Sequence, residues 1–593
     1  VYIGVKGDKI IKKYQHRIPR KSEGYFLKIE KDCIVIAGAD ERGAYYGVQT
    51  LAQLLALDKL PLVEVTDYPD VPYRGVVEGF YGAPWSQEAR IRQLDFYGRN
   101  KMNVYIYGPK DDPYHRTPNW RKPYPAREGE ELKVLVNRAK ENNVIFYWAI
   151  HPGQDIRWNE EDRSLLLQKF ESMYQLGVRG FAVFFDDISG EGTKADKQAE
   201  LLNYIDDHFV KVKRDVAPLI LCPTEYNKSW TDVEGGYLTT LGDKLNEGIK
   251  VMWTGDMVVA TIDKSTLDFV NPLLKRKAYI WWNFPVSDYV QDHLLLGPVY
   301  GNGLDVKDDM SAFVSNPMEH AEASKISLYS VADYTWNMEN YDSETSWKHA
   351  VRDLMPLHAE YLEIFAAHNS DPGQNGHRFR REESVAIQPA LSALLKAYQE
   401  KNEIDEDAYR QVAEECRKII VAADGLLASG NENRPLITEI RPWLIQFKQV
   451  GEYGAEVLNM IRLRQQKDAF IGSYEHARAL LVLMGETDAQ YKAGIKSGSL
   501  HLMPTFNALF EAATTGYNAA FHAGLDTKAV YSPYTLKSDV NQLASLPIQQ
   551  KGKVNTIIPS NEVINWQAGG VLTISMDYAR QLSSVLIDLG DAE

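Results

Sequence analysis

In the segment GFAVFFDDISG, residues 180–190, five apolar residues are followed directly by two adjacent acids, Asp186 and Asp187. A continuous apolar run of this length is typical of a strand that is buried on both faces, as in a parallel sheet. Burying charge without a partner is costly, so two neighbouring carboxyl groups at the end of such a strand need a reason. The segment therefore predicts a functional site at the end of this strand.

A strand–helix alternation surrounds this segment and begins at Tyr73. Apolar runs such as RGVVEGFYG (74–82), VIFYWAIHPG (144–153) and AYIWWNF (278–284) alternate with amphipathic stretches in eight units over about 270 residues. Ser86 is expected to cap the first of the helices. This count predicts a central (β/α)8 TIM-like barrel, which needs about 250 residues. A doubly wound sheet is the alternative, but no G-x-G-x-x-G motif opens the first helix.

The chain of 593 residues is long enough for several domains, and we expect a multidomain α/β protein. Residues 1–68 read as a small N-terminal α/β domain, and residues 69–371 as the barrel. Long amphipathic stretches over residues 372–530 predict a helical bundle. Residues 531–593 read as a β-rich C-terminal segment that begins a further module and is truncated.

Composition excludes several classes of function. The net charge of −15 argues against a nucleic-acid or anionic-membrane partner. The three cysteines, Cys33, Cys222 and Cys416, are far apart and fit neither a disulfide framework nor a metal site. No apolar run reaches the roughly 20 residues of a membrane span. We expect no metal and no cofactor, and the sequence indicates neither the oligomeric state nor the compartment.

In a (β/α)8 barrel the active site lies at the carboxyl ends of the strands. Here those ends carry aromatic, amide and carboxylate groups with one lysine: Glu78–Gly82, Tyr107–Lys110, His151–Gly153, Asp186–Asp187, Thr224–Tyr226, Trp253–Asp256, Trp281–Asn283 with Asp288, and Ser315–Asn316. Aromatic rings can stack on the apolar face of a sugar, and amides and carboxylates can bind its hydroxyls. This composition predicts a carbohydrate site.

Two adjacent carboxyl groups do not fit the usual glycosidase arrangement. Carboxyl groups that flank a glycosidic bond lie about 5–5.5 Å apart in retaining enzymes and about 6.5–9.5 Å apart in inverting ones. Adjacent residues would approach the sugar from one side. They fit substrate-assisted hydrolysis, in which the 2-acetamido oxygen of the substrate is the nucleophile. One carboxylate then polarises the acetamido N–H, and the other protonates the leaving oxygen, a split in ionisation that close acids favour.

Seven strand-end motifs resemble glycoside hydrolase family 84, the O-GlcNAcase family. They are VVEGFYGAPWS (76–86), YIYGPKDDPYHR (105–116), VFFDDIS (183–189), CPTEY (222–226), WTGD (253–256), WWNFPVSD (281–288) and SNPM (315–318). The set covers the whole expected barrel. The resemblance implies a retaining exo-β-N-acetylglucosaminidase that removes O-linked GlcNAc from Ser or Thr through an oxazoline intermediate.

The resemblance also implies a role for each site residue. Asp186 would orient and polarise the acetamido group, and Asp187 would be the general acid and base. Tyr226 would bind the attacking oxygen, and Asn283 would lie beside Asp187. The other residues that it implies would wall the pocket or contact the sugar: Gly79, Lys110, Trp281, Asp288 and Asn316. Thr254, at the end of a strand, is also expected to bind the substrate.

Strand periodicity adds one inference about the pocket floor. Cys222, Thr224 and Tyr226 would share a strand face, so Cys222 is expected to point inward beneath Tyr226 as a small, uncharged floor near the acetamido methyl group. By the same alternation Trp281 and Asn283 would face the pocket and Trp282 the core. His151 fits a buried, hydrogen-bonded histidine better than a catalyst.

Two other functions stay open. One is a hexosaminidase or hyaluronidase-like enzyme acting on host glycans, and the other is a non-catalytic GlcNAc-binding protein. The expected partner is a GlcNAc-bearing glycoprotein or glycan. The resemblance is compatible with a bacterial protein that is secreted or periplasmic and whose signal peptide is absent from this chain.

Overall fold

The computed structural model describes residues 1–529, 534–538, 548–551, 554–557 and 570–576. The chain divides into two compact units. The first contains Val1–Val290, Leu294–Glu382 and Ser429–Glu439. The second contains Gln291–His293, Glu383–Ala428 and the described residues from Ile440 onward. None of the helices in these ranges has the length and apolar character needed to cross a membrane.

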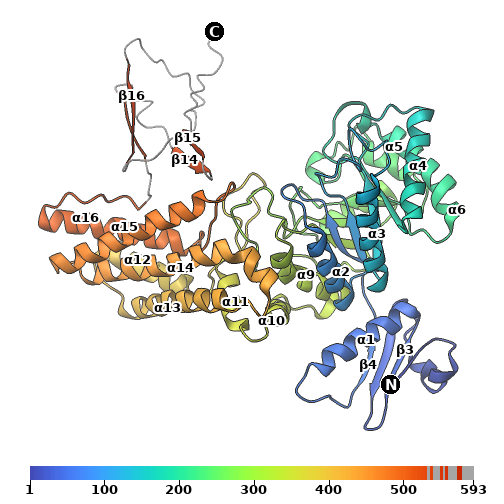
Figure 1. Cartoon of the computed structure of the whole chain (residues 1–593), viewed down its shortest axis with the longest axis horizontal. Helices are drawn as coiled ribbons and strands as arrows, with labels where there is room; N and C mark the ends of the chain where they lie inside the picture. The colour runs from blue at the N-terminus through green and yellow to red at the C-terminus, as the bar shows by residue number, and fades with distance from the viewer. Residues whose placement is uncertain (530–533, 539–547, 552–553, 558–569, 577–593) are drawn as a thin grey trace. The chain divides into compact units, whose positions relative to one another are not determined.

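A closed barrel of eight strands forms the centre of the first unit (Figure 1). Each strand pairs in parallel with the next, and the last pairs with the first, which confirms the barrel and excludes the doubly wound sheet. The strands are β5 (Tyr73–Glu78), β6 (Val104–Tyr107), β7 (Ile145–Ile150), β8 (Gly180–Phe184), β9 (Ile220–Cys222), β10 (Lys250–Trp253), β11 (Ala278–Trp282) and β12 (Met310–Ser315).

Helices follow seven of the eight strands: α2 (Gln87–Arg99), α3 (Ala126–Glu141), α4 (Glu160–Gln175), α5 (Ala195–Ile205), α7 (Tyr237–Lys244), α8 (Lys264–Leu274) and α9 (Ala321–Trp336). Ser86 accepts a hydrogen bond from the Ala89 amide and caps α2, as predicted. The prediction of eight strand–helix units was wrong after β11. Residues 283–309, all of them described, contain neither helix nor strand, because Pro285, Pro298 and several glycines interrupt the segment.

Inward-facing side chains of alternate strand residues fill the barrel interior. They include Val77, Ile106, Phe184, Cys222 and Trp281, which are buried in one apolar cluster. The indole of Trp282 points away from this interior, and its Nε1 donates to the main-chain oxygen of Ala260 at 2.9 Å. The opposite directions of Trp281 and Trp282 confirm the expected alternation.

The small N-terminal domain is a four-stranded sheet with one α-helix, α1 (Glu41–Leu55), as predicted. The sheet order is β1-β3-β2-β4, with β1 (Tyr2–Val5), β2 (Tyr25–Ile29), β3 (Ile34–Gly38) and β4 (Glu64–Asp67), and the 3-10 helix η1 (Lys9–Arg17) follows β1. Tyr25, Leu27, Ile36 and Tyr46 form part of its core.

The second unit is mainly helical. It holds α12 (Gln388–Lys401), α13 (Glu406–Ala428), most of α14 (Arg434–Arg462), α15 (Lys467–Ala489) and α16 (Leu502–Phe521), whereas α10 (Ser343–Leu354) and α11 (Ala359–Ala367) belong to the first unit. The described C-terminal strands form two antiparallel pairs, β13 (Tyr534–Ser538) with β16 (Leu572–Met576) and β14 (Ile548–Lys551) with β15 (Val554–Ile557). The rest of the predicted β-rich segment lies outside the described residues.

Candidate functional site

A cavity of about 410 Å³ opens at the carboxyl ends of the barrel strands, a volume within the range of ligand sites. Every site residue predicted from the sequence lines it: Gly79, Lys110, Asp186, Asp187, Cys222, Tyr226, Thr254, Trp281, Asn283, Asp288 and Asn316. The sequence did not single out the other lining residues, which are Tyr81, Trp230, Val258, Val259, Val286, Tyr289 and His377.

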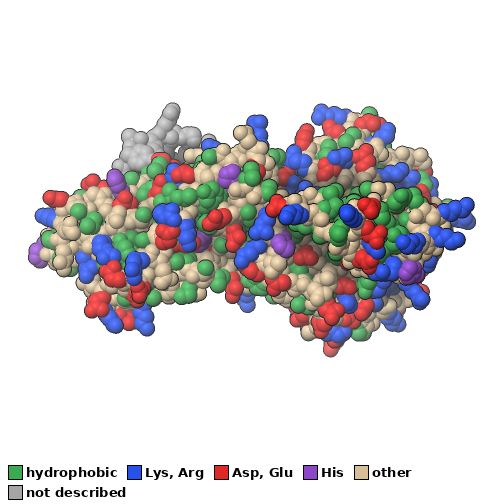
Figure 2. All heavy atoms as spheres, turned by 90° about the horizontal axis from the view of Figure 1, so that it is seen from below, with side chains coloured by type: hydrophobic (Ala, Val, Ile, Leu, Met, Phe, Trp, Pro, Cys, Tyr) green, Lys and Arg blue, Asp and Glu red, His purple; other side chains and the backbone are tan. Residues whose placement is uncertain are grey.

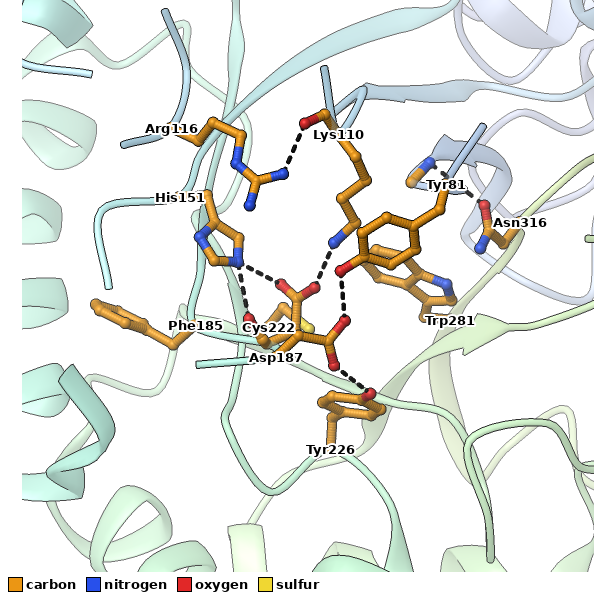
Figure 3. Close-up of polar contacts among 12 residues, drawn as sticks. Tyr81, Lys110, Arg116, His151, Phe185, Asp187, Cys222, Tyr226, Trp281 and Asn316 are labelled. Atoms are coloured by element: carbon orange, nitrogen blue, oxygen red, sulfur yellow. Dashed lines mark hydrogen bonds and ion pairs between the residues drawn. The ribbon is translucent and has the colours of Figure 1, made fainter. Parts of the chain in front are cut away.

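A turn after β8 brings two neighbouring acids to one cavity. Successive side chains of a strand point to opposite faces, so an extended backbone would separate Asp186 from Asp187. The strand ends at Phe184, however, and Asp187 has a φ of 53°, in the left-handed region. Aspartate tolerates this conformation better than most residues. Both acids therefore line the cavity. Asp187 pairs with tyrosines (Figure 3), while Asp186 pairs with lysine.

Asp186 is the deeper acid, with 4% of its surface exposed. Its Oδ2 accepts from the Lys110 ammonium at 2.7 Å, and the His151 Nε2 lies 3.4 Å from Oδ1. Burial raises the pKa of Asp186, but the opposing effects of Lys110 and His151 are larger together and hold its pKa well below the usual range. Burial lowers the pKa of Lys110, but the Asp186 charge outweighs it and the net shift is upward. The pair is therefore ionised.

The Oδ1 atom of Asp186 is buried and has no hydrogen-bond partner among the described residues. The His151 Nε2 lies 3.4 Å from this atom, which is an ion-pair contact, so Oδ1 keeps the capacity to accept from a second donor. The carboxylate is thus held at one oxygen by Lys110 and can accept at the other.

Asp187 lies at the solvent side of the site and holds two tyrosine hydroxyls. Tyr226 donates to its Oδ1 at 2.8 Å, and Tyr81 donates to its Oδ2 at 2.9 Å (Figure 3). Burial and the Asp187 charge raise the pKa of Tyr226. Burial also raises the pKa of Tyr81 to about 12, against the opposing Lys110 charge. Both hydroxyls therefore remain donors. The sequence did not predict either contact.

Asn283 is the centre of a second polar network. Its Oδ1 accepts from Trp281 Nε1 at 2.8 Å and from Asn316 Nδ2 at 3.0 Å, and its Nδ2 donates to the Val258 oxygen at 2.7 Å. These hydrogen bonds fix the indole of Trp281 against the cavity. The placement of Asn283 beside Asp187 stays a prediction.

Gly79 brings main-chain atoms into the cavity wall. A Cβ at this position would lie 2.4 Å from Cζ2 of Trp281, so a side chain could not fit while the indole keeps its place. The amide of Gly79 donates to Asn316 Oδ1 at 3.3 Å. The amide of Gly79 is therefore already engaged within the protein.

The loops after β5 and β11 meet at Asp288, whose Oδ2 accepts from the Tyr81 amide at 2.9 Å. Burial raises the pKa of Asp288, against the effect of this amide. The rings of Tyr289 and His377 meet edge to face nearby, with centroids 4.8 Å apart. His377 lies in the segment predicted to begin the helical bundle, so no strand-end pattern could have found it.

The pocket floor differs from the prediction at one residue. Cys222 lines the cavity and is 2% exposed, and burial raises its pKa well above the usual value, which keeps the thiol uncharged. Thr224, however, does not share the face of Cys222 and Tyr226. The strand ends at Cys222, and Pro223 breaks the alternation, so Thr224 Oγ1 donates outside the cavity to the main-chain oxygen of Phe185 at 3.0 Å.

Thr254 connects two strand-end loops behind the cavity. Its amide donates to the main-chain oxygen of Tyr226 at 2.9 Å, and its hydroxyl donates to that of Met257 at 3.0 Å. The described residues contain no group of three or more His, Cys, Asp or Glu side chains placed to bind a metal ion.

The sequence matches four family models in the order of its domains. Domain 2 of glycosyl hydrolase family 20 matches residues 11–68, beta-N-acetylglucosaminidase matches 74–367, the bacterial GH84 post-catalytic domain matches 383–510, and carbohydrate binding module family 32 matches 525–588. The solved structure of CpGH84B is 34% identical, with a TM-score of 0.75 over 82% of this chain and 86% of that chain. The chain belongs to glycoside hydrolase family 84.

Other relatives are consistent with family 84. Protein O-GlcNAcase of Rattus norvegicus is 35% identical over 276 residues, which are 45% of this chain and 30% of the relative. The chain thus spans about a third of the length of this relative. A mutant of the Thermobaculum terrenum O-GlcNAc hydrolase is 25% identical, with a TM-score of 0.66 over 78% of this chain and 100% of that chain.

Proposed function

We propose that this family 84 member is a retaining exo-β-N-acetylglucosaminidase that removes O-linked GlcNAc from Ser or Thr by substrate-assisted catalysis. One observation carries the proposal: two adjacent acids face one cavity in different environments. Asp186 is buried and ionised beside Lys110, and its Oδ1 has no hydrogen-bond partner in the described chain, whereas Asp187 is exposed and accepts from two tyrosines. The two acids are neighbours in the chain and do not flank the cavity as a protein nucleophile and its acid would. The third lining carboxyl group, Asp288, accepts from the Tyr81 amide and is proposed to bind a ring hydroxyl.

In the first step, the acetamido carbonyl oxygen attacks the anomeric carbon. The bond from this carbon to the Ser or Thr oxygen breaks, and its electron pair leaves with that oxygen, which takes the proton of Asp187. Asp186 accepts a hydrogen bond from the acetamido N–H at Oδ1 and stabilises the positive charge that develops on the oxazolinium ring. Tyr226 steadies the attacking oxygen or the Asp187 carboxyl group that it contacts.

In the second step, water attacks the anomeric carbon and gives a proton to Asp187, which is exposed to solvent. The bond from this carbon to the former carbonyl oxygen breaks, and its electron pair restores the acetamide. The sum is one glycoside and one water converted to GlcNAc and an alcohol, and Asp187 ends protonated as it began. Two displacements at the same carbon retain its configuration. These steps use no cofactor.

The remaining lining residues are proposed to hold the sugar. Asp288, Asn316, Lys110 and the carbonyl of Gly79 present fixed charges or dipoles suited to ring hydroxyls, and the Trp281 indole walls the cavity. Cys222 and Thr254 would complete the wall and floor around the acetamido group, and Asn283 would support the reacting centre through Trp281 and Asn316. The domain boundaries at 68/69 and 371/372 remain predictions, and the boundary at 530/531 lies outside the described residues.

Replacing Lys110 by Met is expected to move the acid limb of the kcat/KM profile to higher pH. Lys110 holds the pKa of Asp186 low, so the wild-type carboxylate stays ionised in mild acid. Without this cation, only His151 opposes the effect of burial, so the pKa of Asp186 rises and the group takes up a proton at a higher pH. The pH profiles of both proteins measure the position of the limb. An unchanged acid limb, whatever the height of the profile, would contradict this role of Lys110.

One relative favours a second candidate. Beta-hexosaminidase of Vibrio vulnificus is 36% identical over 95 residues, which are 16% of this chain and 11% of the relative. The match to a carbohydrate binding module also suits a glycan substrate. A hexosaminidase or hyaluronidase-like enzyme is therefore the alternative, whereas the paired acids argue against a non-catalytic GlcNAc-binding protein. On the face shown in Figure 2, basic side chains are interspersed with acidic ones, which does not favour a nucleic-acid partner.

The experiment compares an O-GlcNAc peptide with a hyaluronan polymer under identical conditions. The proposal predicts release of GlcNAc from the peptide and no fall in the viscosity of hyaluronan. A rapid fall in viscosity with no release from the peptide would replace the proposal by the endo-acting alternative.

A further inference from the structure

A buried histidine, His151, touches the main chain at Asp186 although the proposed steps do not use it. It follows the last residue of β7, and 4% of its surface is exposed. Its Nε2 lies 2.8 Å from the main-chain oxygen of Asp186 and 3.4 Å from Oδ1 (Figure 3). We propose that His151 is a positioning residue that fixes the direction of the Asp186 carboxylate toward the acetamido N–H. This inference rests on the proposed function.

The acceptor decides the tautomer of the ring. A carbonyl oxygen can only accept, so Nε2 carries the hydrogen. The other nitrogen, Nδ1, is buried and has no hydrogen-bond partner in the described part of the chain. The Nε2–H group therefore faces Asp186 alone, with the shorter contact to its main-chain oxygen and the longer one to its carboxylate.

This hydrogen bond acts where the strand ladder ends. The last ladder pair between β7 and β8 is Ile150 with Val183, and on the other side the Phe185 amide donates to the Cys222 oxygen at 2.9 Å. His151 thus binds the main chain just after the end of β8, on the side that faces β7. The next residue, Asp187, has the left-handed backbone that turns its side chain into the cavity, so a shift of this peptide would redirect both acids.

Both partners of Asp186 are held by the same short segment. The His151 amide donates to the main-chain oxygen of His115 at 2.7 Å. The Arg116 guanidinium donates to the main-chain oxygen of Lys110 at 2.6 Å (Figure 3). The segment formed by His115 and Arg116 therefore fixes His151 and Lys110 relative to each other, and through them it fixes the main chain and one carboxylate oxygen of Asp186.

The proposal predicts a specific kinetic defect. In His151→Phe an aromatic ring remains, but the Nε2–H donor is lost. Lys110 can still bind the Asp186 carboxylate, whereas the main chain of Asp186 is free to shift. We expect kcat to fall roughly 10- to 100-fold, the range for losing a partner that orients a reacting group or for a shift of about 1 Å. KM should change much less. His151→Gln, which keeps an N–H donor at a similar reach, should recover most of the rate.

The experiment measures kcat and kcat/KM for the full chain with two substrate series, aryl β-GlcNAc glycosides of varied leaving group and 4-nitrophenyl glycosides with mono-, di- and trifluorinated N-acetyl groups. In His151→Phe the slope against fluorination should become steeper, because Asp186 no longer stabilises the charge on the oxazolinium ring. The leaving-group slope should stay as in the wild type. His476→Phe, at a side chain that is 77% exposed in the second unit, is the matched control.

Each outcome of these measurements supports or overturns the positioning role of His151. A uniform loss of rate in His151→Phe with both slopes unchanged, or a folded His151→Gln variant as slow as His151→Phe, would overturn the positioning role. If His151→Phe does not fold, His151→Gln decides alone, and failure of both to fold would make His151 a stability residue and overturn it as well. A wild-type protein whose rate is indifferent to fluorination would instead overturn the proposed function.

Discussion

Replacing Asp187 by Asn should lower kcat/KM for an O-GlcNAc peptide by roughly 10²- to 10⁴-fold, the usual contribution of a general acid–base group. The serine or threonine oxygen is a poor leaving group and needs the proton that Asn cannot supply. Asn is the suitable replacement because it tolerates the left-handed backbone at this position and still offers an oxygen to Tyr226 or Tyr81.

Aryl glycosides with strongly activated leaving groups should lose much less activity in the same variant, because their departure needs no proton. Steady-state kinetics on both substrates measure this difference. Asp256→Asn is the matched control, since Asp256 is an exposed acid at the end of β10 that does not line the cavity. If Asp187→Asn lost the same factor on both substrates, or nothing on either, Asp187 would not be the acid.

Replacing Asp186 by Asn should cost roughly 10²- to 10³-fold in kcat, the range found when a group that stabilises developing charge is removed. The loss should be similar for good and poor leaving groups, because Asp186 acts on the acetamido group. The variant also leaves the buried Lys110 ammonium without its ion-pair partner. We therefore expect a lower Tm as well, since breaking a buried pair is destabilising by about 3–5 kcal/mol.

Kinetics across the aryl series together with a thermal melt of Asp186→Asn test this expectation. Rates measured well below the Tm of the variant separate the chemical effect from unfolding. A loss confined to poor leaving groups would exchange the roles of Asp186 and Asp187. A fully active variant would show that the acetamido group needs no carboxylate.

The barrel and its cavity were predictable because they depend on patterns within single strands. Each apolar run predicted a strand, and the closed parallel order brought the strand ends together, so residues from Gly79 to Asn316 meet in one cavity. The absence of a helix after β11 was not predicted. The strand–helix alternation of the other seven units indicated a helix there, but Pro285 and several glycines prevent it.

The contacts made by loop residues could not be predicted from the sequence. Periodicity failed at Thr224 because Pro223 ends the strand face, and no pattern links His377 to the acids, which lie far away in the chain. Tyr81 follows Gly79 by two residues in EGFYG, so the motif itself contained the one signal that could have found it. The fit of His151 against Asp186 depends on the exact ends of β7 and β8, which only the three-dimensional structure defines.

The central claim is that the substrate supplies the nucleophile and the two acids assist it. The most direct measurement is kcat/KM of the wild-type protein on 4-nitrophenyl glycosides whose N-acetyl group carries zero to three fluorine atoms. The account predicts a steady fall in rate with each fluorine, because the carbonyl oxygen becomes a weaker nucleophile. A rate that does not depend on fluorination, with a glycosyl ester trapped on Asp186 or Asp187, would contradict it.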